Sequence, residues 1–327
     1  MVHPLPRNRL IVYPDADPDE NSILTEVGAE RLTAYGALAI HHGEPQSSED
    51  YLSRIKDATA LIVGWSLPTD VMSHAPHLEL VTFTGTGASD YIDLRAARDQ
   101  GITVCNCPGY ADRTVAEHAF ALLLGAARNL TLLDQKMREG VWDQDTPGIG
   151  LAGKQLGLIG FGGIAKKVLK MAEGFGMNVK AWTRSPEKHQ NDFSPDLFLD
   201  METLLETSDF ISLHLPLNDE TQEMLGNPEI SRIKAGAILI NTARGGLLDE
   251  TALIEALRSG QIKGAGLDVF AEEPLRDNHP LLSFENVVLS PHVAYNTPEA
   301  VKAIFDITVQ NICSYFDGEP INVVAAP

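Results

Sequence analysis

The most informative part of the chain is residues 154–183, which read KQLGLIGFGGIAKKVLKMAEGFGMNVKAWT. An apolar run leads into GFGGIA, where Gly160, Gly162 and Ala165 form the pattern GxGxxA, and helical spacing follows. Glycines at these positions let the backbone turn tightly and approach a pyrophosphate, which the positive end of the next helix stabilises. The stretch therefore predicts a strand, a phosphate-binding turn, a helix and a second strand of a dinucleotide-binding fold.

Short apolar runs on both sides of this stretch extend the pattern. Downstream, further strands are expected at 209–216, 236–243, 264–270 and 286–292, after those at 154–162 and 177–183. Upstream, five runs lie at 9–13, 37–40, 60–64, 78–83 and 102–106. Polar or amphipathic stretches of helical length separate most of these runs. The fold class predicted is α/β, with two doubly wound parallel-sheet domains, of which the larger is a Rossmann dinucleotide-binding domain.

Two long helical patterns connect or end these series. Residues 114–140, TVAEHAFALLLGAARNLTLLDQKMREG, predict one long helix that is apolar almost all round in its first half and stops at Gly140. A helix of that kind is buried in a core or between subunits. The tail predicts a final helix with Thr297 as N-cap and Pro298 at its first position.

Charge and composition exclude several classes of function. The 327 residues suggest two domains, and the formal net charge of -20 would repel nucleic acid and anionic membrane. An anionic cofactor or substrate must therefore find local positive charge, which directs attention to single arginines. Neither a secretory signal nor an apolar run of about 20 residues is present, so a cytoplasmic enzyme is expected.

The three cysteines, Cys105, Cys107 and Cys313, give no disulfide framework and no zinc pattern. We expect buried apolar thiols in a reducing compartment, and no metal site. His74 and His77 have ligand-like spacing, but no second pair joins them, which favours a surface turn.

Three chemically suited side chains follow three predicted strands. Arg244 comes just after the strand ending NTA, Glu273 lies in LDVFAEEPL, and His292 lies in LSPHVA. Ligands bind outside the carboxyl ends of strands in open α/β sheets, so these residues are expected to meet at one edge. An isolated Arg, Glu or His would be a structural residue, but three at successive strand ends favour a catalytic site.

Across nearly its whole length the chain resembles the D-isomer-specific 2-hydroxyacid dehydrogenase family, which includes D-lactate, phosphoglycerate and glyoxylate or hydroxypyruvate enzymes. The resemblance rests on GTG (85–87), NCPG (106–109), VAEH (115–118), PHVA (291–294) and the spacing of the three residues above. It implies that Arg244 holds the substrate carboxylate and carbonyl oxygen and that His292 donates the proton during reduction. Glu273 would pair with His292 and favour its charged form. The function implied is hydride transfer between NAD(P)H and C2 of a small 2-oxo or 2-hydroxy acid.

The resemblance also implies the binding residues. Thr86 and Gly87 match the segment whose amides receive the substrate carboxylate, and Asp268 matches a residue that contacts the nicotinamide carboxamide. The cofactor residues implied are Gly160, Gly162, Gly163, Ile164, Thr183, Arg184, Ser185, Pro216, Thr242, Ala243 and Asp268.

The end of the second strand departs from the NAD-binding pattern. An acidic residue is expected there to bind the ribose 2'-hydroxyl, but Thr183, Arg184 and Ser185 occupy the position. A guanidinium and two hydroxyls suit a 2'-phosphate, so NADP is predicted to be preferred, with NAD possible as a second cofactor. A solvated loop role for Arg184 is the alternative.

By the same resemblance, residues 1–104 and 294–327 form the substrate domain and residues 105–293 the dinucleotide-binding domain. The catalytic cleft would lie between them, and the helix after Asp112 would pair two subunits into a homodimer. His118 and His214 are interpreted as structural, with His214 placed where it could line the cofactor site.

Two other functions fit parts of the sequence. The first is an NAD(H)-sensing corepressor-like binding protein of the same fold, which would carry appended tails. The second is a formate dehydrogenase, in which Gln would be expected at the position that Glu273 occupies here. The substrate depends on loops around Leu67, Thr84 and Tyr110 and is not predicted from the sequence.

Overall fold

A computed structural model describes residues 9–327, with the side chains of residues 18–22 left undescribed. These residues form two compact units, one of residues 9–111 and 297–327 and the other of residues 112–296. The sequence places the boundaries after residues 104 and 293. Residues 105–111 lie in the first unit because Cys105 ends a strand of its sheet and Cys107 is buried against its last helix.

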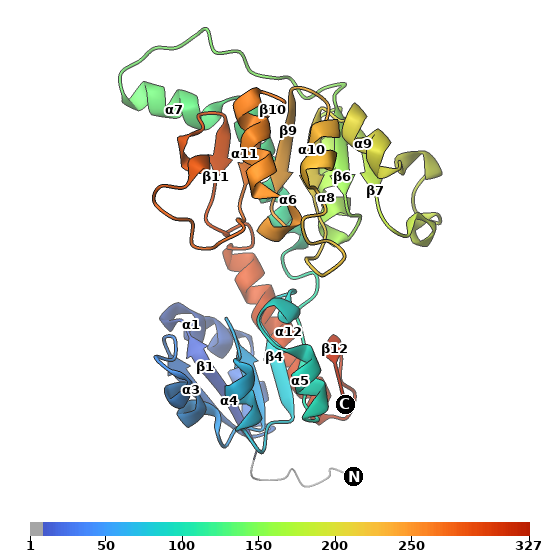
Figure 1. Cartoon of the computed structure of the whole chain (residues 1–327). Helices are drawn as coiled ribbons and strands as arrows, with labels where there is room; N and C mark the ends of the chain where they lie inside the picture. Colours follow the sequence, from blue (N-terminus) through green and yellow to red (C-terminus); the bar gives the residue numbers. More distant parts are fainter. Residues whose placement is uncertain (1–8) are drawn as a thin grey trace. The chain divides into compact units, whose positions relative to one another are not determined.

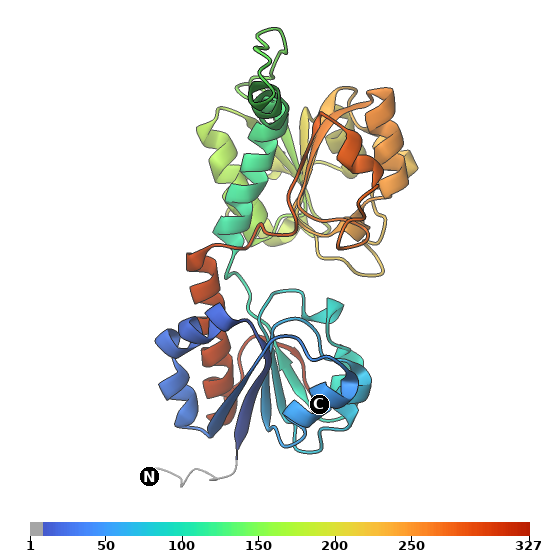
Figure 2. The same cartoon turned by 90° about the vertical axis from the view of Figure 1, so that its left-hand side faces the viewer.

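The first unit is a six-stranded sheet between two layers of helices (Figures 1 and 2). Its strands are β1 (Leu10–Ala16), β2 (Ala37–His42), β3 (Ala60–Val63), β4 (Leu80–Phe83), β5 (Thr103–Cys105) and β12 (Val323–Ala325). The order is β12-β5-β4-β3-β1-β2, and only β12 runs antiparallel to its neighbour. The fold class predicted from the sequence is confirmed. Strand β12 is not predicted from the sequence.

The helices of this unit divide between the two faces of the sheet. One face packs on α1 (Pro18–Val27), α2 (Ala29–Thr33) and α12 (Pro298–Phe316), and the other on α3 (Ser48–Ile55), α4 (Thr69–Ser73) and α5 (Leu94–Asp99). Helix α12 begins as predicted: the Thr297 hydroxyl accepts a hydrogen bond from the Ala300 amide at 3.3 Å, and Pro298 is in the first turn. The three cysteines are buried and free, as expected.

The second unit is a fully parallel sheet. Its strands are β6 (Gln155–Ile159), β7 (Asn178–Trp182), β8 (Phe210–Leu213), β9 (Ala237–Asn241), β10 (Ile262–Leu267) and β11 (Val287–Leu289). The order is β11-β10-β9-β8-β6-β7, so the chain reverses its direction of travel across the sheet between β6 and β8. Such a switch point is where open α/β sheets bind their ligands.

Five helices cover this second sheet. Helices α6 (Asp112–Ala127) and α8 (Gly163–Gly174) pack on one face, and α9 (Met201–Thr207), α10 (Asn227–Arg232) and α11 (Glu250–Ser259) pack on the other. The central strands β6, β8, β9 and β10 are therefore buried on both faces, which explains their largely apolar sequences.

The long helix predicted over residues 114–140 is two helices, α6 and α7 (Leu130–Arg138). Asn129 adopts a left-handed conformation with φ 50° and ends the helical path. A returning segment then closes the end of α6, since the Ile149 amide bonds the Ala127 carbonyl at 2.7 Å and the Asn129 side chain bonds the Pro147 carbonyl at 3.0 Å.

The two helices have different surroundings. Helix α6 is buried in its own unit against α8, β9 and β10, whereas α7 has no buried residue. Helix α7 and residues 139–150 extend from the rest of the unit as an arm, seen in green in Figures 1 and 2. The core thus accounts for the apolar half of the predicted helix, which is α6. In residues 9–327 no helix is long and apolar enough to cross a membrane.

Candidate active site

The turn after β6 has the geometry of a phosphate-binding loop. Gly160 has φ 95°, and a Cβ there would overlap the His214 carbonyl, so only glycine fits. Gly162 is the N-cap of α8, has open space where a Cβ would lie and supplies no side-chain cap. A Cβ on Gly163 would overlap the Asp112 carboxylate. The first amides of a helix, such as that of Ile164 in α8, have no carbonyl partner within the helix and form its positive end. Helix ends of this kind bind anions.

Buried polar atoms with no protein partner lie at the ends of the neighbouring strands. In the described part of the chain, Ser212 Oγ, His214 Nε2 and Thr242 Oγ1 are buried and make no hydrogen bond. Strands β8 and β9 pair Ser212 with Ile240, so the three side chains belong to one face of the sheet. Burial lowers the pKa of His214 to about 4, so its ring is neutral at physiological pH. Polar groups of this kind suit the hydroxyls and amides of a dinucleotide.

The residues that replace the acidic position follow β7. Thr183, Arg184 and Ser185 lie directly after Trp182, the last residue of β7, and the Arg184 guanidinium forms an ion pair with Glu220. Glu220 belongs to the loop after β8, which also contains Pro216 and is closed by a hydrogen bond from Thr221 to the Pro216 carbonyl at 2.7 Å. Both charged side chains are largely exposed, Arg184 by 78% and Glu220 by 71%.

The three residues proposed for catalysis follow β9, β10 and β11, which are adjacent strands. His292 Nδ1 lies 2.7 Å from Glu273 Oε2, and Glu273 Oε1 accepts a hydrogen bond from the Phe270 amide at 3.0 Å. Partial burial raises the pKa of Glu273, but bonds from the His292 ring and the Phe270 amide, with the charges of His292 and Arg244, bring it below its ordinary value. Glu273 is therefore an anion bonded to His292.

Arg244 is held by its own turn. Its carbonyl accepts a hydrogen bond from the Asn241 side chain at 2.9 Å, and its guanidinium donates one to the Ala243 carbonyl at 2.7 Å. The next residue, Gly245, lies so close to the Phe270 carbonyl that no Cβ fits. This close approach joins the turn that carries Arg244 to the segment that leads to Glu273.

The backbone of His292 is fixed by Asp268. His292 has φ 54°, an uncommon conformation for a residue with a side chain, and its amide bonds the Asp268 carbonyl at 2.7 Å. The Asp268 carboxylate is fully buried and accepts hydrogen bonds from Ser290 Oγ at 2.6 Å, the Val293 amide at 3.0 Å and the Ala294 amide at 2.8 Å. Asp268 thus holds residues 290–294, the loop that carries His292. Contact with a carboxamide stays a prediction.

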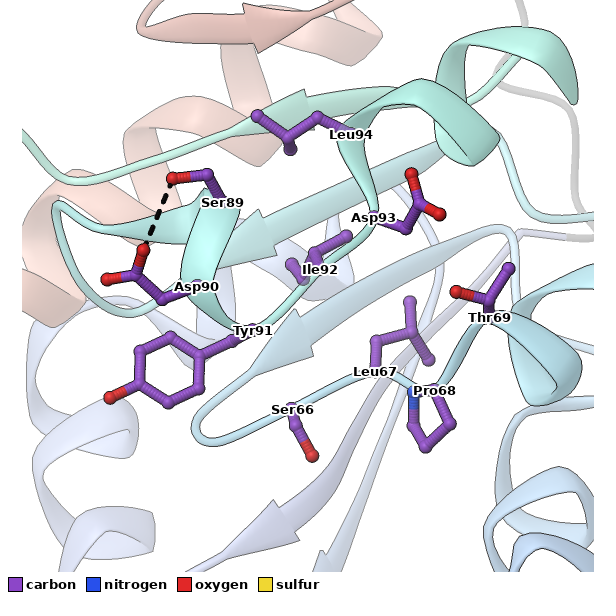
Figure 3. Close-up of a pocket in the computed structure, with 10 residues that line it drawn as sticks. All are labelled: Ser66, Leu67, Pro68, Thr69, Ser89, Asp90, Tyr91, Ile92, Asp93 and Leu94. Atoms are coloured by element: carbon purple, nitrogen blue, oxygen red, sulfur yellow. Dashed lines mark hydrogen bonds between the residues drawn. The ribbon is translucent and has the colours of Figure 1, made fainter. Parts of the chain in front are cut away.

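The predicted substrate residues lie in the other unit. Thr86 and Gly87 follow β4, and the Thr86 carbonyl accepts a hydrogen bond from the Asn106 side chain at 2.7 Å. Nearby residues form an open groove of about 520 Å³ between segments 66–69 and 89–94 (Figure 3). Leu67 and Ile92, which join these segments by a β-bridge, lie in its floor. None of the predicted site residues lines this groove.

A known protein family matches the part of the chain that carries this site. The sequence profile of the family described as "D-isomer specific 2-hydroxyacid dehydrogenase, NAD binding domain" matches residues 120–294, which is more than half of the chain. The chain belongs to the D-isomer-specific 2-hydroxyacid dehydrogenase family.

Named relatives agree with this membership. A glyoxylate reductase of Korarchaeum cryptofilum is 38% identical over 92% of this chain and 93% of its own length. A D-3-phosphoglycerate dehydrogenase of Methanocaldococcus jannaschii is 39% identical over 98% of this chain, which spans only 60% of that longer relative. An NADPH-dependent glyoxylate/hydroxypyruvate reductase of Sinorhizobium meliloti, solved with NADP and malonate, superposes with a TM-score of 0.83 at 30% identity over 97% of both chains. These relatives are enzymes, and no finding supports the corepressor-like alternative.

Some residues of this 2-hydroxyacid dehydrogenase site are not predicted by sequence reasoning. Ser290 lies inside the quoted LSPHVA motif, yet the motif gives no sign of its contact with Asp268. His118, interpreted as structural, lies with Nε2 2.8 Å from Ser290 Oγ. Glu220 gives no signal, because its loop has no periodicity. Among residues 9–327, no group of three or more His, Cys, Asp or Glu side chains is placed to hold a metal ion.

Proposed function

We propose that this protein is a reductase that converts small 2-oxo acids into 2-hydroxy acids with NADPH. The observation that carries the proposal is the 2.7 Å bond between His292 and Glu273 at the ends of adjacent strands, next to a turn that presents Arg244. A charged proton donor, its anionic partner and a guanidinium are the groups that reduction of a carbonyl beside a carboxylate needs.

Each side chain has a defined task in this reaction. The bound nicotinamide supplies the hydride that is added to C2 of the substrate. Arg244 holds the substrate carboxylate and stabilises negative charge on the carbonyl oxygen with its planar donor fork. His292 gives that oxygen a proton, which completes the hydroxyl group. Glu273 orients the ring and favours its charged form before the transfer.

The residues after β6, β8 and β9 fit the cofactor. The uncapped start of α8 suits the pyrophosphate, and Thr242, Ala243 and Pro216 lie at neighbouring strand ends with the unpartnered buried atoms described above. The fit is supported further because Gly162 has space for the close approach of a ligand.

A panel of substrates tests the proposed reaction. Relatives named glyoxylate reductase and hydroxypyruvate reductase make glyoxylate and hydroxypyruvate the first substrates to try, followed by pyruvate and bulkier 2-oxo acids. We expect NADPH oxidation with at least one of the two small acids. Tight dinucleotide binding without reduction of any 2-oxo acid would contradict the proposal.

NADPH preference is supported by Thr183, Arg184 and Ser185, because none of these three residues after β7 is the acidic residue that would repel a 2'-phosphate. The ion pair with Glu220 means that the phosphate must compete for the guanidinium, although exposed pairs of this kind are weak. We expect Arg184→Ala to lower kcat/KM for NADPH about tenfold and leave NADH nearly unchanged. Glu220→Gln is the matched control and should raise NADPH use by up to about fivefold. A wild type that favours NADH, or equal loss of both cofactors, would overturn the preference.

A homodimer is the proposed assembly, with the arm as its surface. Leu130, Met137, Val141 and Trp142 are exposed by 62%, 53%, 49% and 74%, an unusual set for a helix and loop in contact with water alone. A second copy of the chain, as the family resemblance implies, would cover them. We expect light scattering to give twice the chain mass, and Trp142→Glu combined with Met137→Glu to give the single mass. A monomeric wild type would refute the assembly.

A further inference from the structure

A chain of hydrogen bonds connects helix α6 to the loop of His292. His118 on α6 lies with Nε2 2.8 Å from Ser290 Oγ, and Ser290 Oγ lies 2.6 Å from Asp268 Oδ1. The Asp268 carboxylate in turn accepts the amides of Val293 and Ala294. The connection joins residues from α6, the end of β10 and the end of β11, within one unit.

The direction of these bonds follows from the carboxylate. An ionised carboxylate only accepts, so the Ser290 hydroxyl gives its proton to Asp268. Ser290 Oγ can then only accept from His118, which places a proton on His118 Nε2. His118 Nε2 also lies 3.5 Å from Asp268 Oδ1. Burial raises the pKa of Asp268, but bonds from His118, Ser290 and the two loop amides bring it below its ordinary value.

The loop needs this support for two reasons. His292 occupies the left-handed region with φ 54°, a conformation that persists only where the surroundings impose it. Asp268 is fully buried, and a buried carboxylate keeps its position only while its donors are in place. Among the residues described, His118 is the side chain able to carry positive charge that lies nearest to this carboxylate.

We propose that His118 and Ser290 are positioning residues for the proton donor: through Asp268 they fix the backbone of residues 292–294 and so the place of the His292 ring. The effect on catalysis rests on the proposed function, whereas the fixing of the loop backbone does not depend on it. His118 has a side chain only 26% exposed, directed at Ser290, and makes no contact with substrate in this assignment.

Amide exchange tests the structural part without any assay of activity. In the full-length protein, His118→Leu and Ser290→Ala should each accelerate hydrogen exchange of the peptide spanning residues 290–296, which contains the amides bonded to Asp268. Ser208→Ala is the matched control: its hydroxyl is fully buried and bonds the Leu204 carbonyl at 2.6 Å, remote in sequence from the His292 loop. Unchanged exchange in both variants, or equal acceleration in the control, would overturn the proposal.

Kinetics test the catalytic part. We expect the turnover rate in the reduction direction to fall roughly two- to tenfold in His118→Leu and Ser290→Ala, the range for one lost hydrogen bond, while cofactor affinity is unchanged. Ser290→Thr keeps a hydroxyl and His118→Gln keeps a donor, so each should recover most of the rate. In a His292→Ala background, His118→Leu should cause no further loss, because the positioned group is gone. A further loss of the same size there would refute the role. If wild type reduces no 2-oxo acid, the proposed function fails while the exchange result still decides the positioning.

Discussion

Replacing Glu273 with Gln removes one charge from the pair with His292 and leaves the size of the side chain unchanged. In the direction of reduction, His292 must carry a proton, so the rate falls as pH rises past the titration of the ring. An adjacent anion delays that fall to higher pH because it favours the cation. We expect the falling limb of the profile to move to lower pH in Glu273→Gln.

The size of the shift follows from the geometry of the pair. With the bonded atoms 2.7 Å apart, the two charge centres lie about 4 Å apart, which gives about 1 kcal/mol in water and about 4 kcal/mol near a protein surface. The side chains of His292 and Glu273 are 31% and 35% exposed, so water screens the pair and the lower part of the range applies. We therefore expect kcat/KM for reduction to fall roughly fivefold on the alkaline side of the profile, which corresponds to about 1 kcal/mol.

The assay measures the specificity constant for reduction of the oxo acid across roughly pH 5 to 9, at fixed ionic strength, so that the profile spans the ordinary titration range of histidine. Oxidation of the hydroxy acid is the internal control: it needs the neutral ring, so its rising limb should move to lower pH by the same amount. A reduction profile that does not move, or limbs that move in opposite directions, would show that Glu273 does not act on His292 through charge.

Three further variants test the other residues. His292→Ala should lower the turnover rate by about 10²- to 10⁴-fold with cofactor affinity within about twofold, and turnover near the wild-type value would exclude it as the donor. Arg244→Lys keeps the charge but loses the fork, so kcat/KM for the acid should fall roughly tenfold or more, and equal kinetics would mean that Arg244 does not grip the substrate. Asp268→Asn replaces an acceptor with a donor against the Val293 or Ala294 amide, which should cost about 3 kcal/mol of unfolding free energy and lower Tm by roughly 6–12 °C. Because the pKa of Asp268 is lowered, its wild-type contribution is complete above the ordinary carboxyl pKa of about 4 and is lost as pH falls below it, so the difference between the two proteins should narrow in acid.

The strands, and the meeting of the three residues proposed for catalysis at one edge of the sheet, could be predicted because both follow local rules. Each central strand is buried on both faces and so is apolar along its length, which marks it in the sequence. The carboxyl ends of parallel strands lie at one edge of the sheet. Polar residues that follow the neighbouring strands β9, β10 and β11 therefore come close together, although they are far apart in the sequence. Arg244, Glu273 and His292 needed no knowledge of packing to be placed together.

Other features depend on tertiary contacts that leave no periodic signal. The break between α6 and α7 has two causes. Asn129 adopts a left-handed conformation, and the Ile149 amide, at the end of the arm, bonds the Ala127 carbonyl at the end of α6. The apolar side chains of residues 114–140 are compatible with either a protein core or a subunit interface. The packing of α6 inside its own unit shows that its side chains belong to the core. The contact of His118 with Ser290 spans 172 residues of sequence, so no local pattern could reveal it.

In the proposed reaction two carboxylates serve His292, and their different burial suits the different tasks that we propose for them. Asp268 is fully buried and bonded to groups whose charge does not change when a proton moves, so its own charge stays compensated throughout the reaction. Glu273 loses its cationic partner when His292 gives up its proton. A fully buried carboxylate in that position would become an unpaired buried charge, which costs several kcal/mol and would hold the proton on the ring. Because Glu273 is 35% exposed, water solvates it at that moment, and the proton can leave. The backbone of the donor is thus fixed by a buried acid and its charge is set by an exposed one, and exchanging the two environments would impair either the position of the ring or the release of its proton.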